Sequence, residues 1–234
     1  MDKQQQFMES LYADTYKEIK NFEEARGKTK NEIYQLISYA IVTYGSKIKS
    51  VKAKKYIITS VLNMLTKDEK EVEEFVEKQL MINANKVCDF HGYKLTKKEK
   101  QKIVDKVYLG LTYKDRKKQN DENLNKKTHR VLLLLIGGKL IKDSNVINKL
   151  LDKEFKSYTN KVKSIVISET TRISNDLFLY KNKGKMVQYC SILEKNTCAD
   201  CRDLDGEIFP AEEVYDLIPM HSNCKCYWTE VEDI

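Results

Sequence analysis

The chain has 234 residues, enough for one large or two small domains that each bury a core. It contains only two prolines and eight glycines, and this composition argues against a long flexible tether. Its longest apolar run, 131–136, is too short to cross a bilayer, so we expect no membrane span. The first residues lack the pattern of a secretory signal, so we expect the protein to be made and kept in a cytoplasm.

The charge is unevenly distributed along the chain. Residues 186–234 carry three basic and eleven acidic side chains, a net charge of −8, whereas the preceding 185 residues carry +15. A basic surface of this size attracts polyanions, and it favours nucleic acid or an acidic protein ring as a partner. Only five of the 42 basic residues are arginines, so a solvated lysine face without a dedicated partner is the simpler alternative.

The first hundred residues read as amphipathic helices. A first helix is predicted from about Phe7 and is expected to stop near Gly27. Three Thr-x-x-Glu sequences, at 29–32, 66–69 and 96–99, have the pattern of a capping box and are each predicted to begin a new helix. Apolar residues at helical spacing follow each of them, which indicates a bundle with short connections.

The helical pattern continues through the middle of the chain. Leu109-Gly110-Leu111 is predicted to interrupt a helix, and the charged segment 113–128 leads into an apolar run that ends at Gly137-Gly138. Two more helices are predicted over 146–155 and 162–178, the second of them ending before Gly184.

The pattern changes at residue 186. Residues 186–192 favour a strand, and Asp205-Gly206 is typical of a hairpin turn ahead of 207–209. We therefore predict a mainly α fold: an elongated helical bundle followed by a small α+β module. The predicted domains are a basic helical region, 1–185, and an acidic Cys/His module with a β-hairpin, 186–234.

The C-terminal module contains a metal-ligand pattern. A C-x2-C pair is followed, nineteen residues later, by H-x2-C-x-C, which offers Cys198, Cys201, His221, Cys224 and Cys226. Two such segments can complete a tetrahedron around Zn²⁺, and a module of under fifty residues needs an added crosslink because its core is small. Cys198 and Cys201 would take part in any arrangement, while the other three compete for two places.

Three other interpretations of these cysteines compete with a zinc site. A redox pair is disfavoured because Asp200 and Asp203 are expected to raise the thiol pKa values and no βαβ context is present. Disulfides require an oxidising compartment, and they stay open as an alternative if the protein ends in an extracellular particle. A metal nuclease built on His221-Ser222-Asn223 is disfavoured because the other two histidines lie far upstream.

Elsewhere the chain carries weaker patterns. Cys88 and His91 are interpreted as a helix-end thiol and a capping histidine, and His129 as a residue of a helix face. Glu169 and Arg172 are expected to form a modest surface ion pair. The sequence lacks a phosphate-binding loop, a nucleophile elbow and a catalytic carboxylate pair, so the residues do not support an enzyme.

Particular residue types follow one another in a distinctive order in the C-terminal module. They are Thr197-Cys198-x-x-Cys201-Arg202-x-Leu204-Asp205-Gly206, then Phe209, then Pro219-x-His221-x-Asn223-Cys224-x-Cys226. This order resembles the C-terminal signature of the phage head-morphogenesis or minor head proteins, the family similar to phage Mu protein F. The segment 167–175 is similar to the helix that precedes the module in that family, and the resemblance covers about the last half of the chain.

The resemblance implies a minor component of the phage head, associated with the portal and present inside the virion after assembly in the host cytoplasm. It implies other head proteins as partners and makes packaged double-stranded DNA a candidate partner of the basic region. We expect a non-enzymatic protein with a structural zinc ion. The alternatives are a zinc-containing nucleic-acid-binding regulator and a toxin-like enzyme, and the second is disfavoured because no further catalytic domain is left in the chain.

Overall fold

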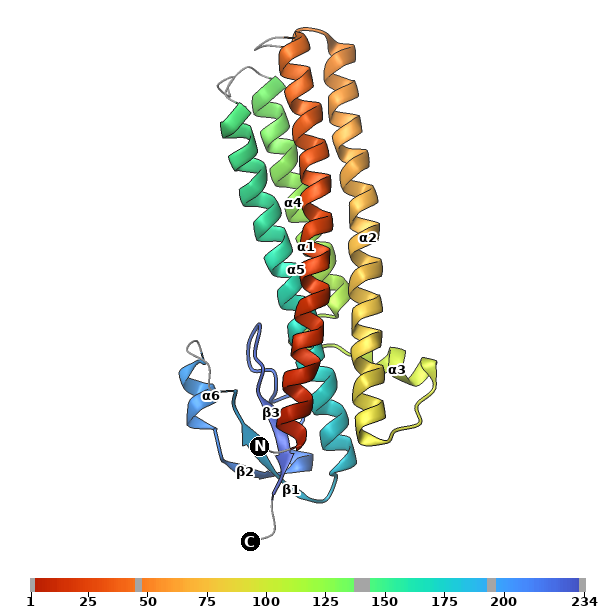
Figure 1. The fold of residues 1–234 in the computed structure, drawn as a ribbon, viewed down its shortest axis with the longest axis vertical. Helices are drawn as coiled ribbons and strands as arrows, with labels where there is room; N and C mark the ends of the chain where they lie inside the picture. Colours follow the sequence, from red (N-terminus) through yellow and green to blue (C-terminus); the bar gives the residue numbers. More distant parts are fainter. Residues whose placement is uncertain (1–2, 45–47, 137–143, 193–196, 232–234) are drawn as a thin grey trace. The chain divides into compact units, whose positions relative to one another are not determined.

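The computed structural model describes residues 3–44, 48–136, 144–192 and 197–231. Within these ranges six α-helices precede or interrupt a small three-stranded sheet, so the predicted mainly α fold with a C-terminal α+β module is confirmed (Figure 1). The elements are α1 (Lys3–Tyr44), α2 (Val51–His91), α3 (Lys97–Val104), α4 (Tyr113–Ile136), α5 (Ser144–Lys181), β1 (Met186–Cys190), α6 (Ala199–Asp203), β2 (Ile208–Pro210), the 3₁₀ turn η1 (Ala211–Glu213) and β3 (Tyr227–Glu230). None of the described helices is apolar over a length that could span a membrane.

Several predicted helix boundaries are wrong because the helices continue through them. α1 passes through Gly27 and the Thr29 capping-box sequence, and α2 passes through Thr66. In α1 the buried residues Ile19, Phe22, Arg26, Ile33 and Ile37 are three, four, seven and four residues apart, so they share one helix face on both sides of Gly27. Burial of this continuous stripe outweighs a glycine inside the helix, which costs only about 1 kcal/mol.

One further boundary is wrong for the same reason: the two helices predicted over 146–155 and 162–178 are one helix, α5. The charged segment 113–128 and the apolar run that follows it lie in a single helix, α4. Only the third capping box is confirmed: Thr96 Oγ1 accepts from the backbone amide of Glu99, whose side chain accepts from the amide of Thr96. The predicted break at 109–111 also lies between helices, and Gly137-Gly138 lies outside the described residues.

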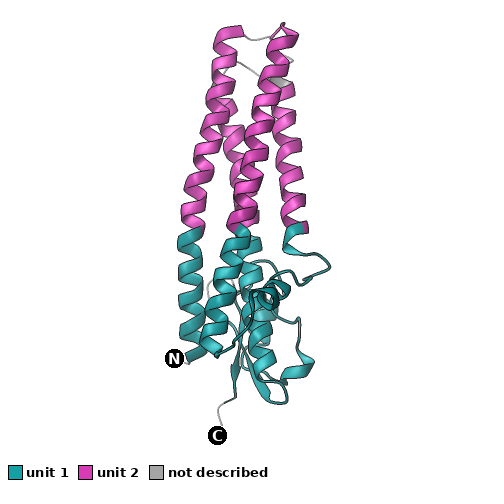
Figure 2. Ribbon diagram, turned by 90° about the vertical axis from the view of Figure 1, so that its right-hand side faces the viewer, with its two compact units in different colours: residues 1–18, 76–114, 163–234 teal, residues 19–75, 115–162 magenta. Residues whose placement is uncertain are grey.

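The contacts divide the chain into two compact units that do not follow the order of the sequence (Figure 2). Unit 1 contains residues 1–18, 76–114 and 163–234, and unit 2 contains residues 19–75 and 115–162. α1, α2 and α5 each contribute residues to both units. The predicted domain boundary at residue 185 stays a prediction.

The sheet of unit 1 has the strand order β2-β1-β3, and both pairs are antiparallel. Val187 is paired with Phe209 on one side and with Glu230 on the other. The strand predicted from residue 186 is therefore confirmed. The Asp205-Gly206 turn lies one residue before β2, with Gly206 at a φ of +89°. The β1–β2 connection is the long segment 191–207, not a two-residue hairpin loop.

The register of the sheet brings distant cysteine segments together. Cys190, the last residue of β1, lies opposite Tyr227, the first residue of β3. Cys226 directly precedes Tyr227 and therefore lies beside the end of β1. From this end of β1 the chain continues toward Cys198. Trp228 and Tyr189 pack edge to face below this point, with ring centroids 5.4 Å apart, and both are fully buried.

Candidate metal centre

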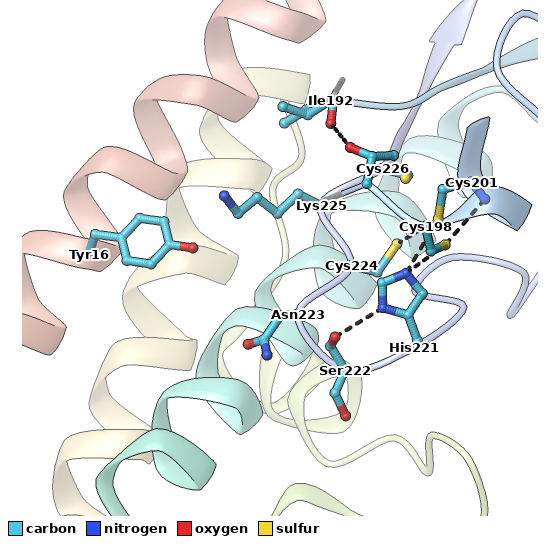
Figure 3. A pocket seen from close by; sticks show the side chains of 11 residues that line it. Tyr16, Ile192, Cys198, Cys201, His221, Ser222, Asn223, Cys224, Lys225 and Cys226 are labelled. Carbon is cyan, nitrogen blue, oxygen red and sulfur yellow. Dashed lines mark hydrogen bonds between the residues drawn. The ribbon is translucent and has the colours of Figure 1, made fainter. Parts of the chain in front are cut away.

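The first pair of thiols lies at the start of α6. Cys198 is the N-cap of this five-residue helix, and its Sγ accepts from the backbone amide of Cys201 at 3.3 Å. The Cys-x-x-Cys pair thus lies on the first turn of a helix. This turn points both sulfurs to the same side of the helix start (Figure 3).

His221 approaches these two sulfurs from the second segment. Its Nε2 lies 3.2 Å from Cys198 Sγ and 3.5 Å from Cys201 Sγ, while its Nδ1 lies 3.0 Å from the carbonyl oxygen of Ser222 (Figure 3). A carbonyl oxygen can only accept, so Nδ1 carries the hydrogen and the Nε2 lone pair faces the thiols. This is the arrangement of a metal-binding histidine whose second nitrogen is held by the backbone.

Cys224 and Cys226 complete the cluster. Cys224 Sγ lies 3.9 Å from Cys201 Sγ. The ligand atoms form two overlapping groups, Cys198–Cys201–His221 and Cys201–Cys224–Cys226, and within each group all atoms lie within 4.8 Å of one another. Tetrahedral Zn²⁺ with Zn–S bonds of about 2.3 Å separates neighbouring sulfurs by about 3.8 Å. The structure therefore brings all five predicted residues together at distances that suit a metal ion.

Three polar side chains of α5 hold the second cysteine segment by its backbone. Ser168 Oγ accepts from the amide of Asn223 at 3.0 Å, and Thr171 Oγ1 donates to the carbonyl oxygen of Cys224 at 2.7 Å. Asn175 donates to the carbonyl oxygen of Cys226 at 3.1 Å and accepts from the amide of Trp228 at 2.9 Å. Residues 168, 171 and 175 share one helix face, so α5 acts as a template for the loop.

Hydrogen bonds and burial give the four cysteine thiols of the cluster different pKa values. The backbone amide of Cys201 lowers the pKa of Cys198, which corrects the expectation that the neighbouring aspartates would raise it. Burial raises the pKa of Cys201 to about 11. A hydrogen bond from the Cys226 thiol, supported by backbone groups, lowers the pKa of Cys224 to about 6 and raises that of Cys226. The cluster thus contains thiols that are readily ionised beside thiols that are not.

The other histidines and cysteines of the described residues belong to neither group of ligand atoms. Cys88 is buried near the end of α2 and His129 is exposed on a face of α4, as predicted. His91 is the last residue of α2 and lies among aromatic rings, and its buried Nε2 has no hydrogen-bond partner among the described residues, so its predicted capping role stays a prediction. No disulfide joins the cysteines of the described residues. The sheet beside the Cys-x-x-Cys pair is antiparallel, so the βαβ context of a redox motif is missing from this described part of the chain.

The Glu169–Arg172 pair is buried, so the predicted surface ion pair is wrong. Both side chains are fully inaccessible, and Arg172 Nε lies 2.8 Å from Glu169 Oε2. The guanidinium also reaches Asp176 at 2.9 Å and the carbonyl oxygen of Ile103, near the end of α3, at 2.7 Å. Burial lowers the pKa of Arg172, and these three contacts compensate its charge. The pair is structural, because it ties α5 to the end of α3.

The fold and the cluster define a helical protein that ends in a small sheet module with a Cys/His centre. The chain belongs to the family of phage Mu protein F like proteins, whose family model matches residues 97–229, more than half of the chain. The match includes all five cluster residues and the α5 segment that seats them. No curated protein and no solved structure matches the chain. The family suggests a phage head or morphogenesis protein, associated with the virion and with other head proteins.

Proposed function

We propose that this protein is a non-enzymatic minor head protein that associates with the portal inside the phage head. The observation that carries the proposal is the family match over 97–229, which covers both the cluster and its seat on α5. The cluster is held by buried hydrogen bonds to backbone groups, which is the design of a structural element. The net charge of +15 over residues 1–185 supports an acidic portal face or packaged double-stranded DNA as the partner of the helical region.

We further propose that the cluster binds one structural Zn²⁺ through Cys198, Cys201, His221 and Cys224. The first three ligand atoms lie within 4.8 Å of one another, and Cys224 Sγ lies next to Cys201 Sγ. Cys226 would support the site from outside by donating its thiol hydrogen to Cys224. Four protein ligands leave no open position for a water or substrate, which supports a structural rather than a catalytic metal.

Metal analysis of the purified chain tests the zinc proposal. We expect one zinc ion per chain under reducing conditions and a lower melting temperature after treatment with a strong chelator. Cys224→Ser should lose the zinc, whereas Cys226→Ser should keep it, with Cys190→Ser as the control outside the cluster. Zinc retention by Cys224→Ser together with loss in Cys226→Ser would assign the fourth position to Cys226, and a zinc content near zero in the unmodified chain would refute the site.

The head-protein proposal is tested by the composition of mature particles and by co-purification with the portal protein of the same phage. We expect the chain in purified particles and in complexes with the portal. Absence from both would contradict the proposal.

The charge asymmetry favours one other candidate, a zinc-containing nucleic-acid-binding regulator. A regulator would bind duplex DNA with an affinity that falls steeply as salt increases, since phosphate contacts release counterions. Tight, salt-dependent DNA binding together with absence from particles would favour it. Binding to the portal that changes little with salt would favour the head protein.

A further inference from the structure

Unit 2 is polarised in charge. The helical segments of this unit run side by side (Figure 2). Lys30 of α1 pairs with Asp152 of α5, and Asn125 of α4 donates to Glu69 of α2. We call the described residues 33–67, 123–136 and 144–151 the basic end of this unit. They carry nine lysine or arginine side chains and no carboxylate. The other described residues of unit 2 carry all thirteen of its described carboxylates.

The exposed apolar side chains of unit 2 gather at the same end. Val42 is 85% exposed, Val51 78% and Tyr39 65%, and Tyr44 and Tyr56 are also exposed. Leu62 and Leu133 complete the set, so every large hydrophobic side chain that is exposed in the described part of unit 2 belongs to the basic end. Scattered single exposed residues are ordinary, whereas this concentration marks an interaction surface.

The lysines lie among these apolar side chains. Lys49, Lys52 and Lys55 are exposed next to Val51 and Tyr56, around the start of α2. Two basic residues of this end do reach carboxylates outside it, Lys67 at 3.7 Å from Glu71 and Lys127 at 2.8 Å from Glu154. The lysines around the start of α2 lie in a segment without acidic side chains. Their charge is therefore not neutralised within that segment, and it faces solvent or a partner.

We propose that the basic end of unit 2 docks onto a protein surface that has an apolar centre and an acidic rim. The proposal rests on the proposed function, which supplies the portal protein as that partner. Duplex DNA presents phosphates to the lysines but no apolar surface for Val42 and Val51. A protein interface uses both features, because apolar and aromatic side chains form its centre and charges at the rim guide association.

Two triple variants test the two halves of the surface against the portal protein of the same phage. Tyr39→Gln/Val42→Gln/Val51→Gln removes apolar area, and Lys49→Glu/Lys52→Glu/Lys55→Glu reverses charge. All six side chains are exposed, so folding should be unchanged by circular dichroism. We expect each variant to weaken portal binding by roughly tenfold or more. The apolar variant should keep the salt dependence of binding and the charge variant should lose most of it.

Matched controls carry the same changes elsewhere. Lys20→Glu/Lys153→Glu/Lys161→Glu has the same net charge as the charge variant, and Val107→Gln/Tyr180→Gln/Met186→Gln removes exposed apolar side chains from unit 1. Both controls should bind the portal like the unmodified chain. Duplex DNA and vesicles of phosphatidylcholine with phosphatidylglycerol are tested with the same set of proteins.

The outcomes separate this inference from the proposed function. Portal binding that is equal in all variants would overturn the docking surface and leave the proposed function standing. No portal binding by the unmodified chain, together with its absence from particles, would overturn both. Loss of DNA or vesicle binding in the charge variant, with portal binding unaffected, would overturn the inference in favour of a nucleic-acid or membrane surface.

Discussion

Asn175 contacts three backbone groups with one amide. It donates to the carbonyl oxygens of Thr171 and Cys226 and accepts from the amide of Trp228. The side chain is almost fully buried, so water cannot replace these bonds. The position of the cysteine segment therefore depends on a residue that binds no metal.

Substitution of Asn175 should destabilise the protein strongly. Asn175→Ala leaves the buried amide of Trp228 and the carbonyl oxygen of Cys226 unpaired, and we expect a loss of roughly 2–4 kcal/mol in the free energy of unfolding. Urea denaturation measures the change. Asn160→Ala, at an exposed position of the same helix, should change stability by less than about 0.5 kcal/mol. Equal effects of the two substitutions would contradict the assigned role.

His91 makes stability depend on pH. Its ring lies among Phe90, Tyr93 and Phe178, its buried Nε2 has no hydrogen-bond partner among the described residues, and burial lowers its pKa to about 4, with Lys181 adding to the shift. The unfolded chain takes up the proton near pH 6.5, whereas the folded chain resists protonation down to about pH 4. The stability contributed by neutral His91 is therefore present above pH 6.5 and is lost as the pH falls toward 4.

His91→Phe removes this titration. We expect its free energy of unfolding to fall less steeply than that of the unmodified chain between pH 6.5 and 4.5, as measured by urea denaturation at several pH values. His129→Gln removes an exposed histidine and should leave the slope unchanged. A slope in His91→Phe that matches the unmodified chain would show that other groups carry the acid sensitivity.

The three capping-box sequences show what local patterns can and cannot predict. All three have the same Thr-x-x-Glu pattern, but only the one at Thr96 follows a non-helical segment. Thr29 and Thr66 lie inside long helices because the buried stripe of each helix continues past them. The sequence predicted that helices exist and which faces are apolar, while helix length depended on packing partners that a local pattern does not contain.

Because Thr96 caps a helix and Thr66 lies inside one, replacing each with alanine should change the free energy of unfolding in opposite directions. Thr96→Ala removes the cap of α3 and should lower the free energy of unfolding by about 1 kcal/mol. Thr66→Ala changes an exposed position within α2 and should raise it by about 0.5 kcal/mol, since alanine is the better helix former. Denaturation of both variants under one condition checks the signs. A loss in Thr66→Ala as large as that in Thr96→Ala would contradict the continuous α2.

The sequence predicted the ligand residues of the candidate site, but not the α5 side chains that hold them in place. The spacing of Cys198, Cys201, His221, Cys224 and Cys226 predicted their convergence, because few other arrangements place such residues in a small module. The hydrogen bonds that Ser168 and Thr171 make could not be predicted, because their partners lie about fifty residues away along the chain. The spacing i, i+3 and i+7 of Ser168, Thr171 and Asn175, which places them on one helix face, was the available signal.

At the scale of the whole molecule, contacts within unit 1 cross residue 185. Phe178 and Leu179 of α5 are buried in one apolar cluster with Val187, Tyr189 and Trp228 of the sheet. Exposing such side chains costs about 1.5–3 kcal/mol each. The module of residues 186–234 therefore covers part of the helix that precedes it.

Truncation after residue 185 tests whether the predicted boundary separates independent domains. Because Phe178 and Leu179 would be exposed, we expect the shortened chain to keep its helical signal in circular dichroism but to melt at a lower temperature and to self-associate. Adding Phe178→Gln and Leu179→Gln to the shortened chain should reduce the self-association. The same two substitutions in the full chain should destabilise it, since they place amides in the core of unit 1. A shortened chain that melts like the full chain would instead establish residue 185 as the border of an independently folding helical domain.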